Sequence, residues 1–515
     1  MSTAICQSER DETVRRLAES LYSIAFFREG QKIVSEDVAR DLAATIEKKA
    51  YAAAEVSSST TTGERPKHEV VSLYSKKVGQ LVVEAITQGA SLPAASGAAG
   101  VQVSAAGEIL DLSQGEREFY DAAGARAALA PLLTPHTNIT SVCFSTKSFG
   151  AEAAAVAKEA LHNARASLVD ANLSDVIAGR PEAEALNTLA AMAEGLAECR
   201  LRSVNLSDNA LGEKGIRRVA DVFTKQEALE AITLENVGLS VYACRALDEL
   251  VGPRAQSLKK IHLHNNMSGD EGAEAIGNLL SRAPHMQDFK MVYCRVGGAG
   301  GIALSKGLAA GSSLTHVDLH GNPMGPSMAP ALASALSHQQ DLRVLRLQDT
   351  LLEDEGVAHV CRSLARTAPY LEELDLSLNE ITAGGSQAVA MCLMGKPSLL
   401  RLILRENELG DKGTAQVCRA LKSNETLKVL DLSENQIRGP GAEDAAALVA
   451  GRAGFERLEL DGNWIEDEVV AKVRAVLAAG ASGDVLGSMD ENDADMADDD
   501  EDADELAEGM AKMGV

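Results

Sequence analysis

The sequence predicts an α/β solenoid, a right-handed horseshoe in which each unit contributes one short strand and one helix. Three observations predict it. A phrase of the form LxxLxLxxN recurs about every 28 residues, and apolar residues with helical spacing follow each copy. Aromatic residues make up only 3% of a chain that is 45% hydrophobic, which suits a core of aliphatic layers. The clearest copies of the phrase begin at Leu201, Leu371, Leu427 and Phe455.

The physical chemistry of one copy explains the unit. In the copy that starts at Leu427, Leu430 and Leu432 follow with a 3-then-2 spacing that places all three on the buried side of a short strand. Asn435 can bond backbone groups where the chain turns away. A strand this short does not fold alone, so neighbouring units must stack. Helical spacing after such a copy is clearest at Ile216, Val219 and Phe223.

Weaker copies fill the gaps between the clear ones and bring the number of units to roughly twelve. They extend from about residue 135 to about residue 478, and we place the whole repeat domain at residues 111–480. These copies are Ile139/Val142/Phe144, Leu168/Ala171/Leu173, Leu229/Ile232/Leu234, Leu258/Ile261/Leu263, Met286/Phe289/Met291, Leu314/Val317/Leu319, Leu342/Leu345/Leu347 and Leu399/Leu402/Leu404.

Three further segments flank the repeats. Residues 1–88 have apolar residues near helical spacing and predict a helical head. Residues 89–110 are rich in Gly, Ala and Ser and predict a flexible linker. Residues 481–515 carry a dense run of carboxylates that repel one another, and we expect a disordered tail. The tail either keeps the protein soluble or steers a basic partner toward it.

Composition excludes several classes of protein. The formal net charge of −26 argues against nucleic-acid binding, which needs Lys and Arg to neutralise phosphates. No apolar run approaches the roughly 18 residues of a membrane span, and the first residues lack the apolar core of a signal peptide. The eight cysteines are scattered singly, as expected of reduced thiols in the cytosol or nucleus. We expect protein partners and no membrane insertion.

The strand residues that alternate with the buried leucines should line a polar, mixed-charge concave face. His262 and His264, or His316 and His320, lack the ligand complement of a typical zinc site, so we expect no metal. The chain has no GxxxxGK[ST] and no GxSxG, so nucleotide binding and serine nucleophile chemistry are not indicated. The residues alone predict a binding scaffold. Besides the two pairs of histidines, this face includes Ser203, Asn205, Ser207, Lys260, Asp318, Arg346, Gln348, Glu373, Asp375, Arg401, Arg405, Glu459 and Asp461.

Three stretches of the repeats resemble the plant-type Ran GTPase-activating proteins. They are LVDANLSDVIAGRPEAEALNTLAAM from Leu168, LRSVNLSDNALGEKGIR from Leu201 and IHLHNNMSGDEGAEAI from Ile261. The head, with SEDVARDLAATIEKKAY and VVSLYSKKVGQLVVEAI, resembles the helical targeting domain of plant members, named for its Trp-Pro-Pro motif. The acidic tail lies where the family has one.

The resemblance implies a function that needs no active site in this chain. Such a protein stimulates GTP hydrolysis by the small GTPase Ran in nucleocytoplasmic transport, and it works by ordering the GTPase's own catalytic glutamine. It is therefore not an enzyme itself. It needs no cofactor, because the partner GTPase holds GTP and Mg²⁺. The implied location is the cytoplasm, with the nuclear envelope as a second site, and the implied anchor is a coiled-coil protein bound by the head.

Two residues match the family's motifs and are the predicted catalytic residues, acting in trans on bound Ran. Arg180 ends the SDVIAGR segment and matches the family's arginine on which activity depends. In the family this arginine does not act as an arginine finger, that is, it does not enter the nucleotide site. Asn236, in LENVG, matches the asparagine that contacts the catalytic glutamine. Asp208, from the neighbouring loop, and His264, on the concave face, are the predicted partner contacts.

Alternatives stay open for each of these predictions. Arg180 would have a purely structural role if it paired with Asp175 or Glu182. Glu182 also stands where fungal relatives have a lysine, so a basic contact is not available there. The only tryptophan is Trp464, so the head lacks the Trp-Pro-Pro motif. The alternative functions are a non-catalytic repeat scaffold and an enzyme inhibitor of the ribonuclease-inhibitor type.

Overall fold

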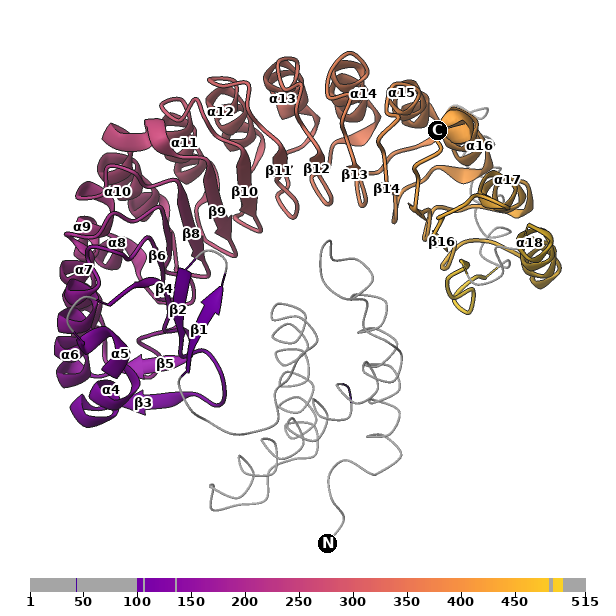
Figure 1. The fold of residues 1–515 in the computed structure, drawn as a ribbon. Coiled ribbons are helices and arrows are strands. Elements are labelled where there is room, and N and C mark those ends of the chain that lie inside the picture. Colours follow the sequence, from indigo (N-terminus) through magenta and orange to yellow (C-terminus); the bar gives the residue numbers. More distant parts are fainter. Residues whose placement is uncertain (1–42, 44–99, 105–106, 135–136, 481–484, 494–515) are drawn as a thin grey trace, which may run out of the picture. The chain divides into compact units, whose positions relative to one another are not determined.

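The computed structural model describes residue 43 and residues 100–104, 107–134, 137–480 and 485–493. The predicted helical head lies outside these residues, apart from Ala43. The described chain from residue 100 onward is a leucine-rich-repeat solenoid, so the predicted fold class is confirmed. Figure 1 shows its strands along the inside of an arc and its helices along the outside. No helix of the described part combines the length and the apolar character needed to cross a bilayer.

One sheet of fourteen strands runs through the solenoid in sequence order, with β3 and β5 left out of it. All neighbouring strands in this sheet are parallel except β1 and β2, which form an antiparallel pair. Its strands are β1 (Gly100–Ser104), β2 (Gly107–Asp111), β4 (Ile139–Cys143), β6 (Asp170–Asn172), β7 (Ser203–Asn205), β8 (Ala231–Glu235), β9 (Lys260–His264), β10 (Asp288–Val292), β11 (His316–Asp318), β12 (Val344–Arg346), β13 (Glu373–Asp375), β14 (Arg401–Ile403), β15 (Val429–Asp431) and β16 (Arg457–Glu459).

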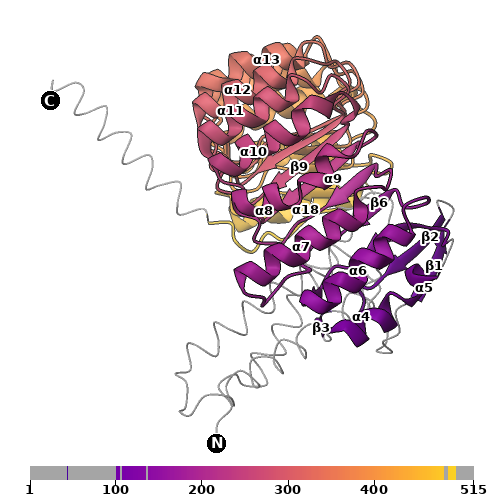
Figure 2. The ribbon, with the colours of Figure 1, turned by 90° about the vertical axis from the view of Figure 1, so that its left-hand side faces the viewer.

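Helices connect the parallel strands and stack in rows on the convex side (Figure 2). The twelve predicted copies of the repeat correspond to β4 and to β6 through β16. The helices are α4 (Ala122–Ala128), α5 (Ala130–Leu133), α6 (Ala151–Asn163), α7 (Glu182–Leu196), α8 (Gly212–Arg218), α9 (Ala220–Thr224), α10 (Val241–Val251), α11 (Gly269–Leu280), α12 (Gly298–Leu308), α13 (Ala329–Leu336), α14 (Glu353–Leu364), α15 (Ala383–Leu393), α16 (Gly410–Ala420), α17 (Gly439–Val449) and α18 (Asp467–Ala479), with 3₁₀ turns at Gly252–Ser257, Pro326–Met328 and Leu421–Ser423.

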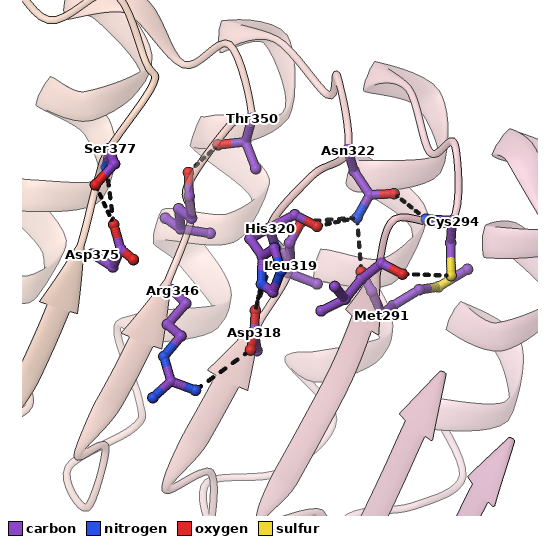
Figure 3. A network of polar contacts seen from close by, with 12 residues as sticks. Met291, Cys294, Asp318, Leu319, His320, Asn322, Arg346, Thr350, Asp375 and Ser377 are labelled. Atoms are coloured by element: carbon purple, nitrogen blue, oxygen red, sulfur yellow. Dashed lines mark hydrogen bonds and ion pairs between the residues drawn. The ribbon is translucent and has the colours of Figure 1, made fainter. Parts of the chain in front are cut away.

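The repeat asparagine joins neighbouring units through hydrogen bonds of its side chain to their backbones, which we call stitching. Asn322 shows how (Figure 3). Its Oδ1 accepts the backbone N–H groups of Cys294 and Val296 at 3.0 and 3.1 Å. Its Nδ2 donates to the carbonyls of Met291 and Leu319 at 2.7 and 2.8 Å. A buried backbone group without such a partner costs free energy, so each asparagine stabilises the loop of the preceding unit as well as its own.

Helix starts are stabilised across units in a similar way. Asp354, in the first turn of α14, accepts the backbone N–H of Thr382 at 2.8 Å in the next unit. Asp411 does the same for Arg438 and Gly441, both at 2.9 Å. A carboxylate at a helix N-terminus satisfies N–H groups that have no partner within the helix. The units are therefore joined along both the strand side and the helix side.

The N-terminal end of the solenoid differs from the prediction. Of the predicted flexible linker, residues 89–110, the described part lies in β1 and β2, which continue the sheet beyond β4. Register pairs Leu110 with Val142, and Leu110 is fully buried. The linker prediction is wrong for these residues. It relied on the Gly, Ala and Ser content, whereas the alternating apolar residues of VQVS and EILDL are typical of strands. The sheet thus starts about ten residues before the predicted boundary at 111.

A second, two-stranded sheet closes this end, formed by β3 (Glu118–Tyr120) and β5 (Lys147–Phe149). Lys147 occupies the repeat's asparagine position and is buried, with 1% of its surface exposed. Its Nζ donates to the carbonyls of Gln114 and Glu116 at 3.1 and 2.8 Å and pairs with Glu118 at 3.1 Å. A longer side chain than asparagine is needed because the backbone that it must satisfy lies in the preceding, non-repeat loop.

The C-terminal end also differs from the prediction of a tail disordered from residue 481. Residues 485–493 pack on the last repeat, where Leu486 forms a bridge with Leu458 and Met489 is buried. Asn492 accepts the backbone N–H of Asn463 at 2.9 Å, as the repeat asparagines do. An incomplete repeat therefore covers the edge of β16, and the tail prediction is wrong for residues 485–493.

Candidate functional site

The residue directly before the repeat's asparagine position has a positive φ in each described repeat, and these residues form an edge that we call the ridge. From Asp175 to Glu434 the N–H of each ridge residue bonds a carbonyl of the next unit, as that of Asn236 does to His264 at 2.7 Å. A positive φ places the residue in the left-handed backbone conformation, which Asn and Asp tolerate better than other residues with a side chain. The ridge consists of Thr146, Asp175, Asp208, Asn236, Asn265, Tyr293, Gly321, Asp349, Leu378, Glu406, Glu434 and Gly462.

Asn236 is exposed on the ridge and has two side-chain partners, both on the ridge. Its Nδ2 donates to Oδ1 of Asp208 at 3.1 Å. Its Oδ1 accepts from Nδ2 of Asn265 at 3.3 Å. A carboxamide has two donor hydrogens and two acceptor lone pairs, so Asn236 keeps one of each for another molecule.

The neighbouring residue, Val237, fills the repeat's asparagine position and is fully buried. The stitching there comes from the next unit, because Oδ1 of Asn266 accepts the N–H groups of Val237 and Leu239 at 3.2 and 2.9 Å. The side chain of Asn236 thus has no part in the repeat's own backbone stitching.

Arg180 lies between β6 and α7, and its guanidinium is largely engaged within the chain. Nε donates to Oγ of Ser148 at 3.0 Å, and Nη2 donates to the carbonyl oxygens of Ser148 and Tyr120 at 3.1 and 3.5 Å. Nη1 lies 3.6 Å from Oε1 of Glu184, and the guanidinium carbon lies 5.5 Å from the centre of the Phe119 ring. These contacts fix the β5 turn and β3 against the loop that carries Arg180.

Arg180 pairs with a neighbouring carboxylate, as the structural alternative proposed, but this carboxylate is Glu184. Asp175 pairs with Arg117, and Glu182 forms an exposed pair with Lys214 at 2.7 Å. The structural role that the alternative proposed is nevertheless present, because Glu184 and the backbone of the preceding unit take the place of those carboxylates. A planar group with five donors suits such a site, since it can bind several carbonyls at once.

Arg180 and Asn236 come from the same edge of the solenoid, the one where each strand leads into its helix. They are separated by two units, because Arg180 follows β6 and Asn236 follows β8. Neighbouring parallel strands lie about 4.8 Å apart, so the two loops are roughly 10 Å apart along the sheet. A partner of ordinary protein size can contact both.

His264, a predicted partner contact, ends β9 and is half-buried on the concave side of the ridge. Its ring lies 5.9 Å from that of Tyr293, which in turn meets His320 edge-on at 5.0 Å. Tyr293 is 47% exposed. Asp208, the other predicted contact, is exposed beside Asn236. Sequence reasoning missed Asn265 and Tyr293, although both occupy the same position relative to the repeat as Asn236.

The concave face beyond these residues carries a chain of charged groups, part of which Figure 3 shows. Oδ1 of Asp318 accepts a hydrogen from Nδ1 of His320 at 2.6 Å, and the Asp318 carboxylate lies 3.6 Å from Arg346. Burial would raise the pKa of Asp318, but the hydrogen bond with His320 and the two cationic neighbours lower it overall. Arg346 also pairs with Glu373 at 2.6 Å. The charged groups of this network pair with one another, so few of them remain to bind a small ligand.

Metal binding receives no support from the described residues, where no group of three or more His, Cys, Asp and Glu side chains could hold an ion. His262 is instead paired with Asp288 at 2.8 Å. Burial lowers the pKa of His262, while the Asp288 carboxylate opposes that shift. The described cysteines are free thiols, and burial raises the pKa of Cys199 and Cys418 to about 12.

The fold and the ridge define a leucine-rich-repeat protein with an exposed polar edge. The Leucine Rich repeat model matches residues 367–390 and 423–444, and the WPP domain model matches residues 5–96. The second match covers the predicted head, although that segment has no Trp-Pro-Pro. The two matches together fit a WPP domain followed by a solenoid of leucine-rich repeats.

Two relatives from Arabidopsis thaliana are similar to part of the chain. RAN GTPase-activating protein 1 is 36% identical over 230 residues, which is 44% of this chain and 42% of the relative. RAN GTPase-activating protein 2 is 35% identical over 232 residues, or 43% and 41%. With the WPP domain match, they confirm the resemblance to plant-type Ran GTPase-activating proteins that the sequence predicts. The alignments cover less than half of each Arabidopsis relative.

More distant relatives share the repeats. Ran GTPase-activating protein 1 of Saccharomyces cerevisiae is 28% identical over 279 residues, which is 51% of this chain and 69% of the relative. The ribonuclease inhibitor of Sus scrofa is 27% identical over 233 residues, or 39% and 51%. Among solved structures, an internalin of Listeria monocytogenes aligns over 72% of this chain and 94% of its own with 14% identity and a TM-score of 0.42.

Proposed function

We propose that this chain is a GTPase-activating protein for Ran, which stimulates GTP hydrolysis by ordering Ran's own catalytic glutamine. The observation that carries the proposal is the exposed carboxamide of Asn236, which keeps one donor and one acceptor free at the edge of a rigid sheet. A glutamine carboxamide offers the complementary acceptor and donor. Similarity to the Ran GTPase-activating proteins of Arabidopsis and yeast supports the choice of partner.

Catalysis in this proposal is a matter of positioning. A GTPase glutamine that orients the attacking water contributes only when it is held in the productive geometry, and misplacement by about 1 Å can cost roughly 100-fold in rate. Asn236 is suited to hold it, because its backbone is fixed to the next unit by the bond to His264. The chain itself cleaves no bond, and GTP and Mg²⁺ stay with the GTPase.

Arg180 enters the proposal as a residue on which activity depends indirectly. Its guanidinium is engaged with Ser148, Tyr120 and Glu184, which speaks against insertion into a nucleotide site. It holds the loop between β6 and α7, which lies two units from Asn236. Removing it would disturb the first part of the surface that the GTPase contacts.

Asp208 and His264 are the proposed contacts on either side of Asn236. Ran-GTP is the proposed partner in nucleocytoplasmic transport, in the cytoplasm and at the nuclear envelope. The WPP domain match favours anchoring of the head to another protein, for which we propose a coiled-coil partner.

A single-turnover assay of GTP hydrolysis by purified Ran tests the function. Full-length wild type should accelerate hydrolysis, and Asn236→Ala should lower the rate at saturation by about 100-fold, as loss of a positioning contact does. Arg180→Ala should lower it by about tenfold, a smaller effect because its role is indirect. Asp349→Ala is the matched control, since it changes another ridge residue four units from Asn236.

The alternatives make different predictions in the same assay. A non-catalytic scaffold or an inhibitor of the ribonuclease-inhibitor type would give no acceleration by the wild type. Inhibition of a basic ribonuclease by the same preparation would then favour the inhibitor, to which the chain is similar at 27% identity. Acceleration that Asn236→Ala leaves intact would remove the site assignment and keep the activity.

A further inference from the structure

Asn236 is the middle member of a hydrogen-bonded row of three ridge side chains. We propose that its neighbours Asp208 and Asn265 are positioning residues that hold the Asn236 carboxamide in one of its two orientations, with the nitrogen toward Asp208. This role rests on the proposed function, because it defines which edge of Asn236 meets the glutamine of the GTPase.

The order of donors along the row follows from Asp208. A carboxylate only accepts hydrogen bonds, so it must receive a hydrogen from Nδ2 of Asn236, and the two atoms lie 3.1 Å apart. Oδ1 of Asn236 is then turned toward Asn265, whose Nδ2 donates to it at 3.3 Å. The reverse orientation would place the Asn236 oxygen against the carboxylate. One charged residue therefore sets the polarity of the whole row.

The backbone beneath the row is rigid, so the side chains have little freedom to rearrange. Each of the three residues has a positive φ, and each N–H bonds the next unit's carbonyl. These bonds join Asp208 to Glu235 at 2.8 Å, Asn236 to His264 at 2.7 Å and Asn265 to Val292 at 2.9 Å. Rigid backbone with locked side-chain orientation is what a positioning site requires.

The row has defined ends within the described ridge. On one side Asp175 pairs with Arg117, and on the other Tyr293 packs between His264 and His320. The aromatic ring of Tyr293 has no amide group with which to extend the row of hydrogen bonds. The polarity at Asn236 is therefore determined locally, by the two neighbours that it touches.

Reversing the row tests the proposal. Asp208→Asn removes the acceptor-only group, and Asn265→Asp places a carboxylate against the Asn236 oxygen. The double variant Asp208→Asn/Asn265→Asp can form all the hydrogen bonds of the wild type with the Asn236 amide turned over. Asp349→Asn is the control, because it makes the same substitution on the ridge away from the row. Each full-length protein is assayed with Ran-GTP over a range of activator concentrations, and its unfolding temperature is measured.

We expect each single variant to lower the rate at saturation about tenfold, less than the roughly 100-fold that a 1 Å misplacement can cost. The concentration at half-saturation should change less than the rate does, because Asp208→Asn keeps the size of this proposed partner contact. The double variant should stay at least as slow as either single variant while unfolding at the wild-type temperature, and Asp349→Asn should match the wild type.

Two results would overturn this role and leave the activator function standing. One is recovery of the rate in the double variant, which would mean that only the integrity of the row matters. The other is a raised half-saturation with an unchanged saturating rate, which would make Asp208 and Asn265 ordinary contacts. No acceleration by the wild type would overturn the proposed function, and the positioning role with it.

Discussion

The repeats from β6 to β12 and those from β13 to β16 share one backbone but use their polar residues differently. In the later group every asparagine position holds asparagine: Asn379, Asn407, Asn435 and Asn463. In the earlier group asparagine alternates with other residues, and the intervening positions hold Val176, Val237, Cys294 and Thr350. Both groups have the same positive φ on the ridge. The backbone geometry therefore does not depend on the unit's own asparagine.

Asparagines in alternate units are enough for this stitching, because Asn266 bonds the backbone of its own loop and that of the loop at Val237. The ridge accepts polar residues with or without an asparagine after them, since Asp208 precedes Asn209 and Asn236 precedes Val237. In the later group the ridge holds Leu378, Glu406 and Glu434. The two groups therefore differ in the side chains of the ridge, and within the described repeats carboxamides occur there in the earlier group alone.

The largest change in stability should come from breaking the stitching where every unit has it. Asn463→Ala removes the acceptor for the N–H groups of Asn435 and Ile437 and the donor to Leu432 and Leu460. Leaving several buried backbone groups without partners should lower the free energy of unfolding by about 3 kcal/mol. Urea unfolding followed by circular dichroism measures it.

The control is Lys472→Ala, which breaks an exposed pair with Glu468 and should cost less than about 0.5 kcal/mol. An equal, small loss for both variants would contradict the stitching role of the asparagines.

A smaller loss of stability should distinguish the replacement of two arginines, one from each group of repeats. Arg180→Ala removes three hydrogen bonds at a site where 19% of the side chain is exposed, and it should cost about 2 kcal/mol. Arg405→Ala breaks pairs with Glu406 and Glu434 at half exposure and should cost less than about 0.5 kcal/mol. Thermal unfolding of both variants decides whether Arg180 holds the N-terminal loops; equal shifts would argue that it does not.

The smallest effects, about 1 kcal/mol or less for one polar contact, should show opposite dependence on pH. Burial would raise the pKa of Asp318, but the bond with His320 and nearby cations lower it overall. Its contribution is present above the ordinary pKa of about 3.9 and is lost as pH falls through the lowered value. Asp318→Asn should therefore destabilise at pH 7, and the difference from the wild type should shrink as pH falls below about 3.9.

Asp431 should behave in the opposite way, because burial raises its pKa more than the bonds from Ser433 lower it. A raised pKa means that the folded state gains stability as pH falls from neutral through that value. Asp431→Asn should be slightly more stable than the wild type at pH 7, and the difference should shrink toward pH 4. Urea midpoints across this range measure both variants, and slopes of the same sign would contradict the assignment.

The sequence was sufficient for the repeats because each copy carries its own pattern. Leu427, Leu430 and Leu432 predict a buried strand from local spacing alone, and the structure has β15 there. The two ends of the solenoid were not predictable in this way. Lys147 is buried where its ammonium group binds carbonyls about thirty residues earlier in the chain. Met489 packs on the last repeat, and the local composition around Met489 does not indicate this contact. Contacts distant in sequence decide both.

The site was predictable to a similar degree. The resemblance selected Arg180 and Asn236 by motif, and their assignment as catalytic residues stays a prediction. The row that Asn236 forms with Asp208 and Asn265 was not predicted, because the sequence shows no positive φ and no side-chain contact across units. The partners of Arg180 were missed for the same reason, since Ser148 and Tyr120 lie 32 and 60 residues earlier.

The dependence of each loop on the following unit also has a consequence for synthesis on the ribosome. Asn435 finds the acceptor for its N–H only in Asn463, 28 residues later, and Asn463 finds its own in Asn492. A nascent solenoid would thus always carry one unfinished loop at its growing end, which closes only when the next unit has emerged. The short segment that contains Asn492 supplies this acceptor for the last repeat, so the loop of that repeat can close only after residue 492 has been made.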